Sequence, residues 1–80
     1  METRRNVRLT TIDSVKKFVS SLSKYPVDAD LISGRYIVDA KSIMGIFSLD
    51  LSKPIELVIQ YTNEAVMREL ASELEEFFDE

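Results

Sequence analysis

The chain has 80 residues, of which 45% are apolar and 30% are charged, a composition typical of one small folded domain. It contains no cysteine and no histidine. These absences exclude disulfides, thiolate zinc sites and catalysis by cysteine or histidine. We expect no enzyme, no metal and no cofactor. The apolar runs are too short to cross a membrane and no secretory signal is visible, so we expect a single cytoplasmic domain over residues 1–80.

The charges are unevenly distributed along the chain. Residues 1–25 hold six basic and two acidic side chains, a net charge of +4, whereas residues 26–80 hold four basic and 12 acidic ones, a net charge of −8. Nucleic-acid binders are usually basic overall or interleave aromatic residues with the basic ones. Because the whole chain has a net charge of −4, we favour a solvated face or a surface that docks an acidic protein.

A strand and a helix are expected first. Residues 7–10 alternate in polarity and favour a strand. A helix follows, capped by Asp13 or Ser14 and ending near Tyr25, because Pro26 cannot continue it. Its apolar residues recur at helical spacing and are Val15, Phe18, Val19 and Leu22.

A hairpin and a short helix are expected in the middle of the chain. Two alternating segments, residues 28–33 and 35–39, flank a turn in which Gly34 supplies a positive φ angle. Residues 41–49 carry too many apolar side chains for a half-buried strand, and they favour a short helix capped by Ser42.

The last expected elements complete a layered fold. Residues 55–61 alternate strictly and predict a strand, and Asn63 then caps a final helix. The buried stripe of that helix is Met67, Leu70, Ala71, Leu74 and Phe78. Helices on one face of an antiparallel sheet give an α+β fold, an open-faced two-layer sandwich. The residues expected in its core are Val15, Phe18, Val19, Leu22, Leu31, Val38, Ile55, Leu57, Ile59, Leu70 and Leu74.

The segment from Asp39 to Leu49 reads Asp-Ala-Lys-Ser-Ile-Met-Gly-Ile-Phe-Ser-Leu. It resembles the regulatory-serine signature of HPr, the histidine-containing phosphocarrier family of the bacterial sugar phosphotransferase system. The resemblance covers nearly the whole chain from Val7 and implies the HPr fold, a four-stranded antiparallel sheet with three helices on one face. It also implies that Ser42 matches the serine that a dedicated kinase phosphorylates in HPr and in histidine-lacking relatives such as Crh.

One segment departs from the family pattern. Phosphate-carrying members have a loop after the first strand that reads roughly Gly-(Ile/Leu)-His-Ala-Arg-Pro-Ala, whereas residues 9–15 here read Leu-Thr-Thr-Ile-Asp-Ser-Val. The histidine, the arginine and the proline are all missing. The resemblance therefore implies a catalytically silent, Crh-like member. Asp13 could hold a phosphoryl group only beside a metal-binding cluster of acids, which the sequence does not show.

Six residues form the candidate site. Ser42 is the candidate for phosphorylation, and the candidates for partner binding are Ile43, Met44, Phe47, Lys16 and Lys17. The three apolar residues match the patch that the family uses for partners, and the two lysines flank the altered loop. Each also has a structural interpretation: the serine as a helix cap, the apolar residues as core or self-association contacts, and the lysines as solvated charges.

We interpret the chain as a regulatory or adaptor protein that acts through protein contacts, with an HPr-type kinase or a transcriptional regulator as partner. One alternative is a divergent phosphotransferase-system component that binds its enzymes without carrying phosphate. A less favoured alternative is a small nucleic-acid binder that uses the basic first 25 residues, for which a steep salt dependence of binding would be diagnostic.

Overall fold

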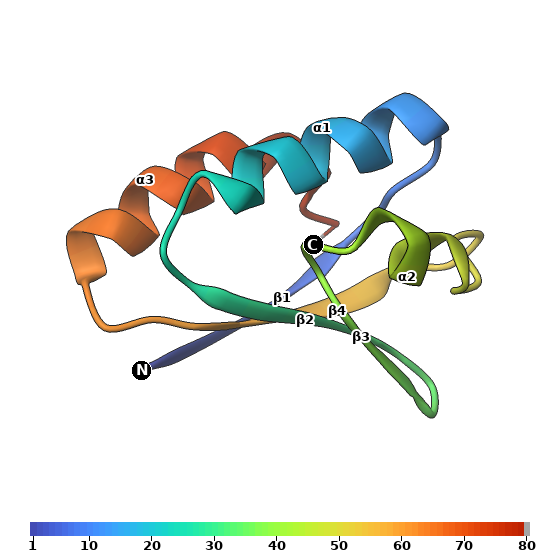
Figure 1. The fold of residues 1–80 in the computed structure, drawn as a ribbon, viewed down its shortest axis with the longest axis horizontal. Helices are drawn as coiled ribbons and strands as arrows, with labels where there is room; N and C mark the ends of the chain where they lie inside the picture. The colour runs from blue at the N-terminus through green and yellow to red at the C-terminus, as the bar shows by residue number, and fades with distance from the viewer. Residues whose placement is uncertain (80) are drawn as a thin grey trace.

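The chain forms one antiparallel sheet and stacks its helices on a single face of that sheet (Figure 1). The computed structural model describes residues 1–79. The elements in chain order are β1 (Glu2–Val7), α1 (Ile12–Ser23), β2 (Asp28–Ser33), β3 (Tyr36–Asp39), α2 (Ile43–Phe47), β4 (Ile55–Gln60), α3 (Glu64–Leu74) and the 3-10 turn η1 (Glu75–Phe77). The predicted α+β open-faced sandwich is confirmed.

The sheet has the strand order β1-β4-β2-β3, so β4 and β2 lie at its centre and β1 and β3 at its edges. Across the central pair, Leu57 lies opposite Leu31 and Ile59 opposite Ala29. These side chains point to the helices, because residues two apart along a strand share a face. The opposite face is open and largely polar, with Val58 buried at its centre between Arg4 and Asp30.

The core lies between the sheet and the helical layer, and ten of the eleven residues expected there are buried. Val38, the eleventh, is half-buried. Phe18 of α1 contacts Phe77 edge to face, with ring centroids 5.5 Å apart. Burying apolar area at about 25 cal/mol per Å² is the main favourable term for a domain of this size.

The first strand differs from the expectation: it spans Glu2–Val7, and residues 8–10 are not part of it. Its helix-facing positions are Thr3, Arg5 and Val7, of which only Val7 is fully buried. Arg5 occupies such a position because its guanidinium lies over the Phe78 ring, 4.1 Å from the centroid. A basic residue therefore fills a place where an alternating pattern would put an apolar one.

The cap of α1 also differs from the expectation. Thr11, and neither Asp13 nor Ser14, is the N-cap residue. The Ser14 amide donates to Thr11 Oγ1 and the Thr11 amide donates to Ser14 Oγ, both at 3.0 Å. This reciprocal capping box starts the helix earlier than predicted, and Asp13 lies in its first turn.

The last helix ends at Leu74, before Phe78. The chain then tightens into η1, which turns Phe77 into the core and leaves Phe78 half-buried beneath Arg5. Met67, Leu70 and Leu74 are buried as predicted, and Ala71 is half-buried. The prediction that Phe78 lies on the buried stripe is therefore wrong, because the adjacent Phe77 is the buried residue.

The C-terminal segment covers part of the β1 edge. The Arg8 amide donates to the Phe77 carbonyl and the Asp79 amide donates to the Asn6 carbonyl, both at 2.8 Å. Charged side chains on β1 add further protection, as is usual for sheet edges. No helix within residues 1–79 is long and apolar enough to span a membrane.

Candidate functional site on the short helix α2

Ser42 caps α2, as predicted. Its hydroxyl oxygen accepts a hydrogen bond from the Gly45 amide at 3.1 Å, and its own amide donates to the Asp39 carbonyl at 3.0 Å. The Asp39 carboxylate accepts from the Lys41 amide at 2.9 Å. The turn between β3 and α2 is thus held by local hydrogen bonds, and Ser42 is half-buried.

Gly45 allows α2 to lie close to the sheet. A Cβ atom at this position would be 3.2 Å from both Ser42 Oγ and Val38 Cβ, tighter than ordinary contacts. The glycine that makes a helix less probable from sequence alone is therefore explained by a close approach. Its absent side chain lets the capping serine and the edge strand fit against the same turn.

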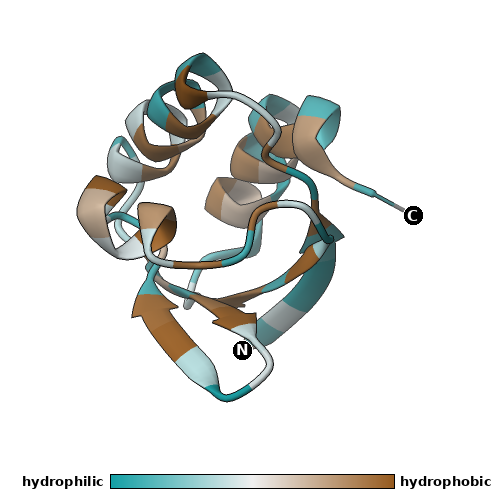
Figure 2. Ribbon diagram, turned by 90° about the vertical axis from the view of Figure 1, so that its right-hand side faces the viewer, coloured by the Kyte–Doolittle hydropathy of each residue, from teal (hydrophilic) through white to brown (hydrophobic). Residues whose placement is uncertain are grey.

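Apolar side chains of α2 divide between the core and the surface. Ile46 is fully buried and anchors the helix, whereas Ile43, Met44 and Phe47 are 37%, 81% and 40% exposed. The interpretation of these three as core residues is therefore wrong. Methionine adapts to partners of varied shape because its side chain is unbranched and polarizable. Figure 2 shows the hydropathy of the helices and the hairpin along the ribbon.

The start of α1 lies next to this surface. α1 contacts α2, and Figure 1 places the first turns of α1 above α2. Ile12, the first residue of α1, is 63% exposed, and Lys16 follows one turn later on the same side of the helix. The sequence did not reveal Ile12 as a surface residue, because its spacing from Val15 and Val19 matches that of the buried stripe.

The two candidate lysines have different surroundings. Lys17 Nζ forms an ion pair with Glu76 Oε1 at 2.8 Å, which ties α1 to the turn after α3. Lys16 forms no ion pair within residues 1–79 and is exposed. Of the two candidate lysines, therefore, only Lys16 is free to meet a partner.

Most of the basic residues near the N-terminus are neutralised within the fold. Ion pairs with acidic residues are formed by Arg4, Arg8, Lys17 and Lys24. The acidic partners of the last three belong to the C-terminal part of the chain, so the net charge of +4 seen in the first 25 residues does not form a separate basic patch. This pairing disfavours a nucleic-acid surface, which needs accessible cations.

The segment that matches the family's phosphate-accepting loop is closed by its own cap. The hydroxyls of Thr11 and Ser14 take up the amides at the start of α1. Asp13 stands exposed beside them, and residues 1–79 contain no group of three or more potential metal-ligating side chains. Nothing in this segment can supply the metal cluster that an aspartyl phosphate site requires.

Two groups with shifted pKa values, Tyr25 and Glu73, lie away from α2, where α1 meets α3. The Tyr25 hydroxyl donates to the Glu73 carboxylate, and this bond raises the pKa of Tyr25 to about 12. Hydrogen bonds from Lys24, at 2.7 Å, and from Tyr25 lower the pKa of Glu73. The cluster joins the end of α1 to α3, and its shifts arise from that pairing and not from a reactive cleft.

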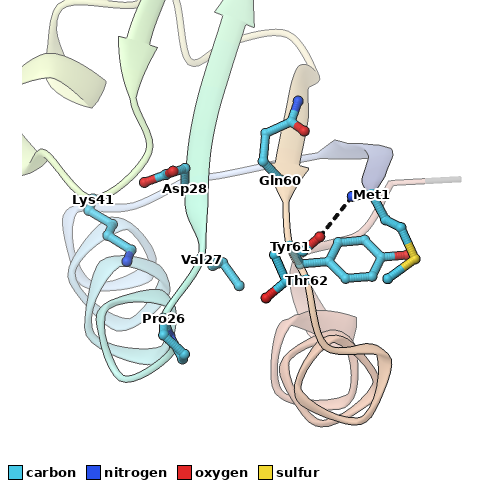
Figure 3. A pocket seen from close by; sticks show the side chains of 8 residues that line it. All are labelled: Met1, Pro26, Val27, Asp28, Lys41, Gln60, Tyr61 and Thr62. Atoms are coloured by element: carbon cyan, nitrogen blue, oxygen red, sulfur yellow. Dashed lines mark hydrogen bonds between the residues drawn. The ribbon is translucent and has the colours of Figure 1, made fainter.

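A shallow pocket opens at the other end of the sheet (Figure 3). Two cations in it donate hydrogen bonds to backbone carbonyls. The Met1 ammonium donates to the Tyr61 carbonyl at 2.8 Å, and Lys41 Nζ donates to the Tyr25 carbonyl at 3.0 Å. The pocket is lined by Met1, Pro26, Val27, Asp28, Lys41, Gln60, Tyr61 and Thr62.

Comparison with solved structures agrees with this architecture. HPr-C-His from Thermoanaerobacter tengcongensis has a TM-score of 0.69 and 26% sequence identity, covering 94% of this chain and 91% of its own. A phosphocarrier protein HPr from Bacillus anthracis has a TM-score of 0.62 and 24% identity, covering 91% and 94%. No family model and no curated protein matches the sequence.

The fold is therefore the HPr-like open-faced sandwich. The chain thus shares this fold with two HPr proteins, to which it is 26% and 24% identical in sequence. Fold likeness leaves the chemistry to be argued from the site, and here the site consists of Ser42 and the exposed side chains of α2.

Proposed function

We propose that this protein is a catalytically silent HPr-like adaptor that docks other proteins through α2 and is switched by phosphorylation of Ser42. The observation that carries the proposal is the exposure of Met44, 81%, two residues after the half-buried Ser42. The partners that fit are an HPr-type kinase and a regulator that reads the phosphorylated surface. The absence of histidine supports a role without phosphocarrier chemistry.

The arrangement of α2 suits a docking surface. Ile43 and Phe47 are one helical turn apart and lie on the same side, with Met44 next to them. Their exposure leaves an apolar surface that water does not favour. Because Ile46 anchors the helix from beneath, a partner can cover the exposed side chains without unfolding α2.

A phosphate on Ser42 would change this surface and not the core. It would add a charge of about −1.5 to −2 and three strong acceptor oxygens. The amide of Gly45, which now donates to Ser42 Oγ at 3.1 Å, could donate to a phosphate oxygen instead. An apolar docking surface would become a mixed apolar and anionic one, which changes the choice of partner.

Treatment with an HPr-type kinase and ATP, followed by mass spectrometry, tests the switch. We expect one phosphate on Ser42. The Ser42→Ala variant should take up none, while Ser48→Ala, which alters the hydroxyl at the other end of α2, should be modified like the unchanged protein. Label on Ser48, or no label at all, would leave Ser42 as a structural cap only.

A phosphomimetic variant tests the consequence for binding. Ser42→Asp should change partner affinity while shifting the free energy of unfolding by no more than about 1 kcal/mol, because the site is at the surface. Calorimetric titration with a candidate regulator measures the first effect and chemical denaturation the second. A loss of stability well beyond that limit would indicate that the residue supports the fold and is not a switch.

Docking to phosphotransferase enzymes without phosphate transfer is the second candidate, and the exposed pair Ile12 and Lys16 beside α2 favours it. Incubation with the general phosphotransferase enzyme and labelled phosphoenolpyruvate should leave the protein unlabelled. If that enzyme nevertheless binds, and binding is lost in Lys16→Glu, this candidate replaces the regulator as the partner. Stable label on any residue would contradict the silent role.

A further inference from the structure

The two edges of the sheet are treated differently by the fold. The β1 edge is partly covered by residues 77–79 and carries three charged side chains, Glu2, Arg4 and Arg5. Within residues 1–79 no segment pairs with the β3 edge beyond the Ser42 amide, which donates to the Asp39 carbonyl, and Tyr36 and Ile37 are 70% and 65% exposed. Figures 1 and 2 show the hairpin of β2 and β3 projecting beyond the helical layer. An uncovered edge strand with apolar side chains is a template for another strand.

The ladder determines which backbone groups of β3 are available. The Ala40 amide donates to the Ala29 carbonyl at 2.9 Å, so these two residues form a hydrogen-bonded pair. Hydrogen-bonded and non-hydrogen-bonded pairs alternate in an antiparallel ladder. The backbone amides and carbonyls of Val38 and Tyr36 therefore point toward β2. The amide and carbonyl of Ile37, opposite Ile32, therefore point outward from the sheet.

The sequence of this edge is complementary to itself. It reads Arg35-Tyr36-Ile37-Val38-Asp39, with a cation at one end, an anion at the other and apolar residues between them. When two such strands pair antiparallel around Ile37, each Arg35 stands opposite an Asp39, and each Tyr36 opposite a Val38. Opposite residues share a face of a sheet, and opposite charges there are favourable.

Charges within one chain also favour this arrangement. Asp39 lies opposite Asp30 across the β2–β3 pair, and like charges at such positions destabilise a sheet. Arg35 forms no ion pair within residues 1–79. One Asp39 oxygen accepts from the Lys41 amide, which leaves the second oxygen to accept from an arginine of another molecule.

We propose that the β3 edge pairs with the β3 edge of a second copy of this chain, in the register that places Ile37 opposite Ile37. A two-fold axis perpendicular to the sheet relates the copies, so the contact is isologous. The two Ile37 residues exchange both backbone hydrogen bonds, and two Arg35–Asp39 pairs flank them. The product is a continuous eight-stranded sheet with all helices on one face. This proposal goes beyond the adaptor role and does not depend on Ser42.

Sedimentation equilibrium over a range of concentrations tests the pairing. With only four residues in β3, the interface is small, so we expect reversible dimers that appear between about 10 μM and 1 mM, the range of weak interfaces. In the dimer, hydrogen exchange of the Ile37 amide should slow with rising concentration. A mass of 9.2 kDa at every concentration would overturn the proposal.

Charge exchange tests the register. Arg35→Glu and Asp39→Lys should each weaken dimerisation about tenfold or more, because each places like charges opposite one another twice. An equal mixture of the two variants restores both opposite-charge pairs, so heterodimers should form nearly as well as in the unchanged protein. Arg68→Glu makes the same change of charge on α3 and should have no effect.

Ile37→Lys supplies an independent arm, because Ile37 is exposed and its replacement should leave the monomer folded by circular dichroism. This variant should be monomeric. It also decides the question if Asp39→Lys fails to fold, since that variant removes the acceptor for the Lys41 amide. Dimers that survive Ile37→Lys, or a mixture of the charge variants that stays monomeric, would overturn this pairing.

Discussion

The two helices that start near each other, α1 and α2, are capped by the same chemistry but are held in different ways. Each begins with a hydroxyl residue whose side chain accepts a backbone amide, Thr11 in α1 and Ser42 in α2. α1 buries four residues in the core, whereas α2 buries only Ile46. This difference indicates that α1 supports the core, whereas α2 lies mainly at the surface and is attached to the core through Ile46 alone.

Replacing the main anchor of α1 should have the largest effect. Phe18 is fully buried and contacts Phe77, so Phe18→Ala should lower the free energy of unfolding by about 3–5 kcal/mol. Urea denaturation followed by circular dichroism measures the change. A loss below about 1 kcal/mol, the size of an ordinary surface effect, would mean that α1 does not support the core through Phe18.

Replacing the anchor of α2 should cost less and act locally. Ile46→Ala should lower the stability by about 2–4 kcal/mol, and hydrogen exchange should increase in α2 more than in α1 because local opening needs only the lost anchor. Amide exchange by NMR distinguishes the two helices. Uniform loss of protection throughout the chain would show that α2 does not open separately.

The two caps provide a smaller and more direct comparison. Thr11→Ala and Ser42→Ala should each cost about 1 kcal/mol, with the larger loss at Thr11 because its capping box also serves its own amide. Thermal unfolding of both variants tests this order. If Ser42→Ala is the more damaging variant, Ser42 contributes more to the fold than a surface switch should.

The smallest expected effect is a difference between the two helices in how stability depends on pH. Glu73, which joins α1 to α3, has a lowered pKa in the folded state because of Lys24 and Tyr25. Its contribution is therefore complete above its unfolded pKa and disappears as the pH falls through the lower folded value. Glu73→Gln should be destabilising at pH 7 and converge with the unchanged protein in acid.

Ile46→Ala provides the matched control for this titration. α2 contains no titratable residue, so the stability lost in Ile46→Ala should be nearly the same at pH 7 and in acid. Denaturation at several pH values gives both curves. A Glu73→Gln difference that persists unchanged at low pH would show that the charged cluster does not hold α1.

The parts of the fold that sequence reasoning predicted are those determined by local interactions. Ser42 could be predicted as a helix cap because a capping serine bonds an amide only two or three residues further along the chain. The buried stripe of α1 could be predicted because helical spacing repeats within a few turns. The hairpin follows from Gly34, whose φ of 59° suits the first position of its turn.

The parts that could not be predicted depend on distant partners. The span of β1 was wrong because Arg5 takes an inner position only through its contact with Phe78. The choice between Phe77 and Phe78 depends on a turn that tightens after α3. For the candidate site, the family resemblance identified the α2 residues, whereas their exposure and the different surroundings of Lys16 and Lys17 required the packing of one helix on another.

The cover of the β1 edge has a consequence for the order in which the chain folds. β1 leaves the ribosome well before β4 and the residues 77–79 that bond to Asn6 and Arg8. During synthesis the first strand therefore waits without either neighbour. Its charged side chains keep it from pairing with other nascent chains, and its outer edge is covered only after residues 77–79 have been synthesised.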